Sequence, residues 1–592
     1  MTDLADASDN TTELQRGIAA LKAYVGPDHE LLLQPRPSLA PASFTYTLPV
    51  DHLGVARRLE VEFPSAFPRA ELRVKIEPSA WLQWPHVFKD GMCLFGGRQR
   101  PFTGSPEDVV TQTLSRVHQL LGLVLPASDP ELRQREFESE IASYWIRQAT
   151  KASQQLVLLA RPSEAQTMFA LTDSLGLISS GVSTVWLASK PELIEAQQER
   201  MSGQRHRARD LAASAFYVPL TSLPSIQLPR ASALHDWLSG HVDASALGPL
   251  EAWLRASARF PVRWLVLDLP GADGARRCCV FVLRATGLRS EQRITYGLRA
   301  NRAARPHSVG SSQETIGWAT VHVLDRASVH GRDRSADKDA IARSRVLLVG
   351  TGTLGGAVAV NLARAGIGRL TLVDPETLAD VNLGRHVLGV ESLGRYKAAA
   401  LRARLRRDLP GVDVVAYATS IEHLLDNEQA LLNDHDLVLV TTADWGSESL
   451  LWQLKGFDAG WSMLQAWSEP HGHVGHALAA PAGPFDARPL FTAAGRFRHR
   501  FSEWPDQGIV TELACGDSFV PSGPVALARI ATMISQLTLE MLIAPPTVPV
   551  WRASIGDVPG IASLKGRYHG PLLPDGATSL ELNRNWPAAD EE

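Results

Sequence analysis

The first 125 residues alternate between helical and strand-like spacing of apolar positions. A helical stripe behind a Thr11/Thr12 cap predicts an amphipathic first helix. Its apolar residues are Leu14, Ile18, Leu21 and Val25. Two strand-like segments, ARRLEVEFP and ELRVKIEP, flank a turn at Phe67-Pro68. The pattern therefore predicts a small α+β unit.

A second helix is predicted after the irregular stretch WPHVFKDGMCLFGGRQRPF. Ser105 suits the cap and Pro106 the first turn, and two acidic residues follow at the positive end of the helix dipole. The expected buried stripe is Val110, Leu114, Val117 and Leu121.

The middle of the chain, 150–320, mixes helical and strand-like segments. VRWLVLDL and CCVFVLRA flank a turn-rich stretch and predict a hairpin. At least one of Cys278 and Cys279 is expected to face a core. Because this region shows no cluster of catalytic residue types, we interpret it as an α/β linker domain.

From about residue 340, short apolar strands alternate with longer helices, as in SRVLLVG, GGAVAVNLARAG and RLTLVD. This alternation predicts a mostly parallel, doubly wound sheet. The fold class is therefore α/β and α+β multidomain. We expect domains at 1–148, 149–320 and 321–592, because 592 residues exceed one hydrophobic core.

Composition narrows the class of function. The net charge of −4 gives no footprint for nucleic acid or an anionic membrane. No apolar run approaches the roughly 18 residues of a membrane span, and the polar, acidic N-terminus is unlike a secretory signal. We therefore expect a cytoplasmic protein. Four cysteines without a CxxC pair predict neither a disulfide scaffold nor a structural zinc.

The segment Gly350-Thr351-Gly352-Thr353-Leu354-Gly355 follows a predicted strand and opens a predicted helix. Glycines there let backbone N–H groups approach a phosphate at the helix N-terminus. Asp374 ends the next strand, where a carboxylate can hold ribose hydroxyls. These features predict a Rossmann-like nucleotide site.

The residues after Asp374 argue against a dehydrogenase. Asn382, Arg385 and Lys397 suit a triphosphate and the charge that develops when pyrophosphate leaves. Asp444 is the last residue of the segment DLVLVTTAD, at the C-terminal edge of a strand, where a carboxylate can hold Mg²⁺ on the phosphates. We expect ATP and Mg²⁺ to bind here.

This ordered set resembles the adenylation domain of the ubiquitin-activating superfamily, which includes the bacterial ThiF and MoeB proteins. The resemblance implies that Asp374 holds the ATP ribose, Arg385 and Lys397 contact phosphates, and Asp444 binds Mg²⁺. It also implies a homodimer and an upstream arginine, for which Arg326 is chosen. Arg332 and Arg334 remain competitors.

Two cysteines are candidate thioester carriers, because a thiolate is a strong nucleophile toward an acyl-adenylate. Cys515 lies in a loop rich in Gly and Pro before an apolar helix, as in the activating family. The N-terminal domain resembles the ubiquitin-conjugating fold, with His86, Gly91 and Cys93 in its loop. It lacks that fold's His-Pro-Asn tripeptide, so His86 either assists Cys93 or braces the loop.

A conjugating-like domain, a linker domain and an activating-like domain, in that order, resemble the CD-NTase-associated ubiquitin-transferase-like enzymes of type II CBASS. The resemblance implies ATP-dependent transfer of a protein C-terminus, that of a cGAS-like CD-NTase, to a lysine or other amine. A separate ubiquitin-like pathway, a ThiF-type sulfur-carrier adenylyltransferase and a non-catalytic scaffold remain alternatives.

Overall fold

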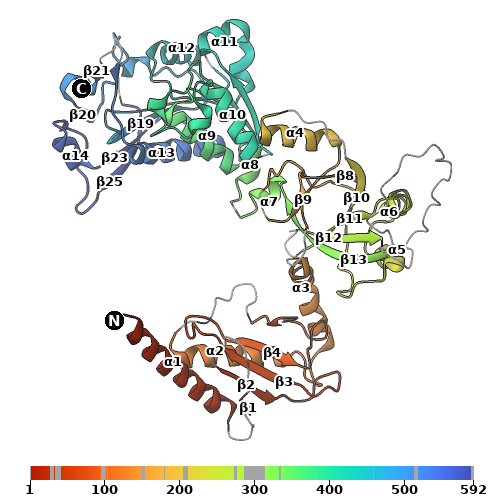
Figure 1. Cartoon of the computed structure of the whole chain (residues 1–592). Helices are drawn as coiled ribbons and strands as arrows, with labels where there is room; N and C mark the ends of the chain where they lie inside the picture. Colours follow the sequence, from red (N-terminus) through yellow and green to blue (C-terminus); the bar gives the residue numbers. More distant parts are fainter. Residues whose placement is uncertain are drawn as a thin grey trace. The chain divides into compact units, whose positions relative to one another are not determined.

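The computed structural model describes residues 2–26, 32–33, 42–94, 102, 104–149, 154–178, 181–204, 211–271, 276–285, 314–332, 335–409, 411–457, 459–511 and 518–587. The chain divides into two compact units. The first covers 1–158, 162–191 and 208–322, and the second 159–161, 192–207 and 323–592. Each unit is described by itself (Figure 1).

The N-terminal part of the first unit is an antiparallel sheet with helices. Strands β1 (Leu32–Leu33), β2 (Ala42–Thr47), β3 (Arg58–Phe63) and β4 (Arg73–Glu77) pair in that order. A short hairpin, β5 (Val87–Phe88) and β6 (Gly91–Met92), follows. Helix α1 (Thr2–Val25) lies against α2 (Pro106–Leu121), whose predicted stripe is buried. The predicted Thr11/Thr12 cap is wrong: no Gly or Pro interrupts 2–12, so the helix already begins at Thr2.

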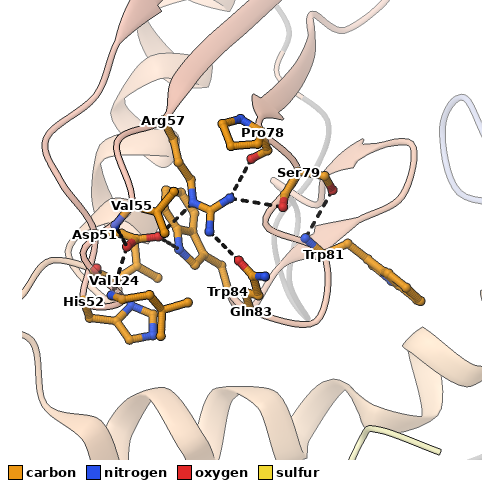
Figure 2. Close-up of polar contacts among 11 residues, drawn as sticks. Asp51, His52, Val55, Arg57, Pro78, Ser79, Trp81, Gln83, Trp84 and Val124 are labelled. Carbon is orange, nitrogen blue, oxygen red and sulfur yellow. Dashed lines mark hydrogen bonds and ion pairs between the residues drawn. The ribbon is translucent and has the colours of Figure 1, made fainter.

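A buried ion pair fixes the loops at one end of this sheet (Figure 2). Arg57 Nε donates to Asp51 Oδ2 at 2.8 Å, and Trp84 Nε1 donates to the same oxygen at 2.9 Å. The other carboxylate oxygen accepts the backbone N–H groups of Leu53 and Val55, both at 2.9 Å. Burial alone would raise the pKa of Asp51, but these hydrogen bonds, that from Arg57 foremost, lower it to about 2.

Helix α3 (Pro130–Ala149) leads into a closed barrel with strand order β10-β11-β12-β13-β7-β9-β8. The strands are β7 (Gln154–Leu158), β8 (Gln166–Thr172), β9 (Ser183–Ala188), β10 (Ala212–Pro219), β11 (Val262–Pro270), β12 (Arg276–Ala285) and β13 (Glu314–Val323). In the sequence, α4 (Pro191–Ser202) follows β9 but belongs almost wholly to the second unit, whereas α5 (Leu234–Ser239) and α6 (Ala244–Ser257) lie between β10 and β11 in the first unit. The predicted hairpin is confirmed as β11 and β12, and Cys278 and Cys279 are both buried.

The second unit is built on an eight-stranded sheet with order β16-β15-β14-β17-β18-β19-β23-β25. Its parallel strands are β14 (Arg345–Val349), β15 (Arg369–Val373), β16 (Asp413–Tyr417), β17 (Leu437–Val440) and β18 (Ser462–Ser468). Its antiparallel strands are β19 (Val474–Ala480), β23 (Val550–Gly556) and β25 (Ser579–Asn585). The predicted doubly wound parallel sheet is therefore present, extended by three antiparallel strands.

The helices of this unit are α7 (Arg326–Val329), α8 (Lys338–Arg343), α9 (Thr353–Ala365), α10 (Lys397–Asp408), α11 (Ile421–Asn427), α12 (Trp445–Lys455), α13 (Pro524–Ile543) and α14 (Val558–Ser563). The minor strands are β20 (Ser502–Glu503), β21 (Val510–Thr511), β22 (Ser518–Phe519) and β24 (Arg567–Tyr568). The unit boundary at 322/323 lies near the predicted one at 320/321, whereas the predicted boundary at 148/149 lies inside the first unit and stays a prediction.

Helix α13 bears on the expectation that no apolar run approaches the length of a membrane span. By length and composition this helix is long and apolar enough to cross a membrane. Among the described residues it is the one helix that meets this criterion. Half of its apolar window is buried in the unit, where it packs against α9 and the sheet. We therefore interpret α13 as a core helix.

Candidate functional site

The glycine loop between β14 and α9 has the shape that the sequence predicts. Gly350 has φ +90°, and a Cβ there would lie 2.8 Å from the carbonyl carbon of Thr441. A Cβ on Gly355 would lie 2.0 Å from the Gly350 oxygen. A Cβ on Gly352, by contrast, would meet nothing within 4 Å. Gly352 also caps α9 without a side-chain hydrogen bond, which leaves the first N–H groups of the helix available to an anion.

A cavity of about 370 Å³ lies at the carboxyl edge of the parallel strands. Gly350, Asp374 and Thr441 each directly follow the end of a strand, β14, β15 and β17 respectively. The cavity is lined by Val349, Gly350, Gly352, Val373, Asp374, Pro375, Glu376, Ser420, Ile421, Glu422, Thr441, Thr442, Asp444 and Ser447. Ligands of open α/β sheets bind at this edge, where the strand order reverses.

Asp374 ties β15 to the glycine loop. Its Oδ2 accepts the Thr351 N–H at 2.7 Å and the Thr351 hydroxyl at 3.0 Å, and its Oδ1 accepts the Glu376 N–H at 2.8 Å. The carboxylate is 5% exposed. Because a carboxylate has about four acceptor positions, a hydroxyl donor at the cavity can still reach it.

Asp444 and Glu422 converge on one hydroxyl group. Ser447 Oγ lies 2.8 Å from Asp444 Oδ2 and 2.6 Å from Glu422 Oε1, although one hydroxyl hydrogen serves only one of them. Hydrogen bonds from the Ser447 backbone and hydroxyl lower the pKa of Asp444. Burial alone would raise the pKa of Glu422, but the bond from Ser447 and backbone contacts lower it.

Two charged carboxylates fit Mg²⁺, which proteins hold through one or two carboxylates together with substrate phosphates. Among the described residues, no group of three or more His, Cys, Asp or Glu side chains is arranged to hold a metal ion alone. The arrangement therefore suits an ion that arrives with a nucleotide.

The predicted residues Asn382, Arg385 and Lys397 are not among the residues that line the cavity. Lys397 is buried at the start of α10, and its ammonium forms an ion pair with the cavity residue Glu376. Arg385 is half-buried. Asn382 Oδ1 accepts the Ala379 N–H at 3.0 Å and so caps a turn of the same segment. In this structure the Lys397 ammonium contacts a cavity residue, whereas the Asn382 amide oxygen bonds within its own segment.

Of the remaining predicted residues, the structure describes Arg326 but not Cys515. Arg326 lies near Gly366, where a Cβ would lie 3.1 Å from its Nη2, at the C-terminal end of α9. The glycine loop is at the other end of this 13-residue helix, about 20 Å away by helical rise. Arg326 therefore does not reach the cavity of its own chain. Cys515 and Arg334 lie outside the described residues.

The structure adds residues that sequence reasoning missed. His386 Nε2 lies 2.8 Å from the Thr351 oxygen and braces the glycine loop. Glu448 is buried behind Asp444, where it accepts from the Thr442 hydroxyl and from Gln465. Burial raises the pKa of Glu448 to about 7. Of the missed residues, Glu376 was the one that the sequence could most readily have indicated, because it stands two residues after Asp374.

Cys93 follows the β5–β6 hairpin in the first unit. Its backbone N–H donates to the His86 oxygen at 2.7 Å, and the residue is half-buried. It lines a second cavity, of about 650 Å³, together with Pro64, Arg69, Ala70, Glu71, Leu72, Arg73, Val74, Asp90, Gly91, Met92, Leu94, Phe102 and Arg147. The predicted loop position of Cys93 is therefore confirmed, and its role as a thioester carrier stays a prediction.

His86 braces this loop. Its Nδ1 lies 2.8 Å from Glu140 Oε1 and its Nε2 lies 3.1 Å from Glu136 Oε2. Burial alone would lower the pKa of His86, but these two carboxylates raise it. Both ring nitrogens are thus engaged away from Cys93, which favours the bracing alternative.

The parallel sheet, the glycine loop and the carboxylates at its edge define a Rossmann-like nucleotide-binding domain. Residues 328–454 match the model of the ThiF family. The chain therefore contains a ThiF-family domain, which covers the whole carboxylate-lined cavity.

The chain is similar to curated proteins named ATP-dependent ubiquitin transferase-like protein Cap2. It is 29% identical to that of Enterobacter hormaechei over 33% of this chain and 30% of the relative. It is 31% identical to that of Pseudomonas aeruginosa over 34% of this chain and 36% of the relative. It is also 40% identical to the molybdopterin-synthase adenylyltransferase of Escherichia coli over 18% of this chain and 42% of the relative. The matches thus span about a third of the length of the first two relatives.

Proposed function

We propose that this protein is an ATP-dependent conjugation enzyme that transfers the C-terminus of a protein substrate to an amine. The observation that carries the proposal is a ThiF-family domain on the same chain as a cysteine that lines a separate cavity. The named relatives support an ATP-dependent transferase of the ubiquitin-activating kind.

The first step is adenylation at the ThiF cavity. A substrate carboxylate oxygen attacks the α-phosphorus of ATP, a P–O bond forms, and pyrophosphate leaves. Asp374 would hold the ribose, and Asp444 would hold Mg²⁺, which would supply neutralisation of phosphate charge when bound. Arg385 and Lys397 approach the phosphates, and for Lys397 this requires exchange of Glu376 for phosphate oxygen.

The later steps are acyl transfers. The thiolate of Cys515 attacks the acyl carbon and AMP leaves, and the thiolate of Cys93 then displaces Cys515. An amine finally attacks the Cys93 thioester, so that a C–N bond forms, the C–S bond breaks and the amine loses a proton. The four-stranded sheet, α1, α2 and the position of Cys93 support a ubiquitin-conjugating-like fold for the N-terminal domain.

We further propose a homodimer. Four apolar side chains are exposed on the segment between Asp374 and Lys397: Val381, Val390, Leu393 and Tyr396. Val381 and Val390 are 68% and 69% exposed, which is unfavourable unless another surface covers them. Because Arg326 does not reach its own cavity, it would act on the nucleotide of the second copy.

The proposed substrate is the flexible C-terminus of a cGAS-like CD-NTase, the acceptor is a protein lysine, and the setting is antiphage defence in the cytoplasm. A ThiF-type sulfur-carrier adenylyltransferase is the second candidate, favoured by the similarity to the E. coli adenylyltransferase. A substrate thioester on Cys93 separates the two, since a sulfur-carrier enzyme does not need that residue.

The test is ATP–pyrophosphate exchange by the full chain, with a recombinant cGAS-like CD-NTase of the same organism as substrate. Asp444→Asn should lower the exchange rate at least 100-fold. Its thermal stability should stay near wild type, because Asn still caps α12 at Ser447. Glu503→Gln, an exposed residue of the same unit, is the control. Exchange that persists in Asp444→Asn would contradict the assigned site.

A further inference from the structure

One face of α3 lies along the loop that carries Cys93. Glu136, Glu140, Tyr144 and Arg147 are spaced by four, four and three residues, which places them on one helical stripe. The two glutamates bond the His86 ring. The first residues of this stripe therefore contact the beginning of the loop, and the stripe continues toward Cys93.

The next residue of the stripe, Tyr144, holds the loop backbone. Its hydroxyl donates to the Trp84 oxygen at 3.3 Å and accepts the Val87 N–H at 3.2 Å. Tyr144 is buried, and burial raises its pKa above the ordinary value. The hydroxyl hydrogen is committed to a carbonyl, so Tyr144 serves as a brace.

Arg147 ends the stripe and lines the cavity of Cys93. The centre of its guanidinium lies 4.0 Å over the Phe88 ring, and its Nη1 lies 3.6 Å from Asp90 Oδ1. Phe88 is buried, and Asp90 stands three residues before Cys93. The ring and the carboxylate hold the guanidinium in place from two directions.

Among the described arginines of this cavity, Arg147 is distinguished by the contact of its guanidinium with the Phe88 ring. All three arginine side chains are exposed, that of Arg147 to 49%, and Arg73 lies 3.5 Å from Glu62 of β3. A guanidinium carries five N–H donors in a planar fork, more than one carboxylate uses. Arg147 therefore combines two contacts that orient it in the cavity of Cys93 with donors suited to a developing negative charge.

We propose that Arg147 stabilises the oxyanion formed when an amine attacks an acyl group on Cys93. This inference rests on the proposed function of Cys93. The amine nitrogen bonds to the carbonyl carbon, and the carbonyl oxygen becomes negative and accepts an N–H from Arg147. Collapse restores the carbonyl, expels the Cys93 thiolate and releases the amine proton to solvent.

The experiment loads Cys93 without the ThiF reaction. A fluorescent synthetic peptide, activated as a mercaptoethanesulfonate thioester, exchanges onto Cys93 of the full chain carrying Cys515→Ala. Free lysine then discharges the thioester. Arg147→Ala should slow discharge about 100-fold, whereas loading should change less than 2-fold. Arg147→Lys should recover only part of the rate, because an ammonium lacks the planar fork.

The matched control is Arg135→Ala on the same helix, whose side chain is 69% exposed and pairs with Glu131. It should discharge at the wild-type rate. Equal discharge by Arg147→Ala and wild type would overturn the role of Arg147 and leave that of Cys93 intact. If Cys93 of the parent chain does not load, or if its thioester discharges no faster than the free peptide thioester, the proposed function of Cys93 fails instead.

Discussion

At the level of single residues, the ion pair of Lys397 and Glu376 shows how a buried positive charge is neutralised next to the ThiF cavity. The ammonium is 7% exposed, whereas its carboxylate partner is 68% exposed. A buried ammonium without a partner would be costly, so Glu376 stabilises it in the absence of nucleotide. In the proposed adenylation step, an incoming phosphate would replace that carboxylate.

Glu376→Gln should therefore lower thermal stability without ATP and enlarge the stabilisation that MgATP gives. The buried Lys397 loses its counter-charge in the free protein and recovers one from phosphate. Thermal unfolding with and without MgATP measures both effects, with Glu503→Gln as the control. An ATP-induced shift equal to that of wild type would show that Lys397 does not meet the nucleotide.

The lowered pKa of Asp51 gives a second prediction at the scale of single residues. Because its pKa is about 2 in the fold and 3.8 ordinarily, its stabilisation is present above pH 4 and is lost as pH falls toward 2. The shift corresponds to about 2 kcal/mol. Asp51→Asn leaves Arg57 buried without a charge partner and should lower the free energy of unfolding by about 3 kcal/mol at pH 7.

Urea unfolding of the full chain, followed by tryptophan fluorescence, measures this loss. The difference between wild type and Asp51→Asn should narrow as pH falls from 4 to 2. Glu131→Gln, whose side chain is 87% exposed, is the control. A difference that stays constant with pH would mean that the Asp51 carboxylate is not depressed.

Sequence alone predicted the residues that follow strand ends, since glycines and a lone carboxylate at such positions have few other uses. It missed Glu376, Glu422 and His386, because their roles depend on partners from neighbouring strands and loops. Lys397 was selected as a phosphate contact, which stays a prediction, and its burial and ion pair with Glu376 were not foreseeable from spacing.

At the scale of elements, the first turn of α12 joins the cavity to the sheet core. Ala443 has a φ of 56°, an uncommon backbone conformation for alanine, between Thr442 and Asp444. Glu448 bonds Thr442 at 3.2 Å and Gln465 at 2.7 Å, and Trp452 donates to Gln465 in turn. This buried network holds the segment that presents Asp444.

The raised pKa of Glu448 makes this element sensitive to pH. The fold favours the protonated carboxyl, so its stability declines as pH rises from about 4.5, the ordinary pKa, to about 7. Glu448→Gln should remove this decline. Its melting temperature relative to wild type should rise by a few degrees between pH 5 and pH 7.5. A constant difference across that range would contradict the assignment.

Elements with regular periodicity were predictable. The stripe of α2, the β11–β12 hairpin and the strand–helix alternation of the ThiF domain are each encoded by local spacing. The start of α1 was misplaced because a Thr-Thr pair resembles a cap even within a continuing helix. The stripe of α3 was missed because its partners lie about 50 residues away and are polar.

At the scale of the whole molecule, the proposed function assigns adenylation and final transfer to different cavities of the chain. Cys93→Ala should therefore leave ATP–pyrophosphate exchange within 2-fold of wild type, because no residue of the Cys93 loop lines the ThiF cavity. The same assay with the CD-NTase substrate measures this. A loss of exchange above 10-fold in Cys93→Ala would show that the two sites do not act independently.

The central claim is that a substrate C-terminus passes from ATP to Cys515 and then to Cys93. Intact-mass analysis of the full chain, incubated with MgATP and the CD-NTase substrate under non-reducing conditions, tests it most directly. We expect a thiol-sensitive substrate adduct on Cys93 in wild type, and none on Cys93 in Cys515→Ala or Asp444→Asn. An adduct on Cys93 that forms without ATP, or that persists in Asp444→Asn, would contradict the account.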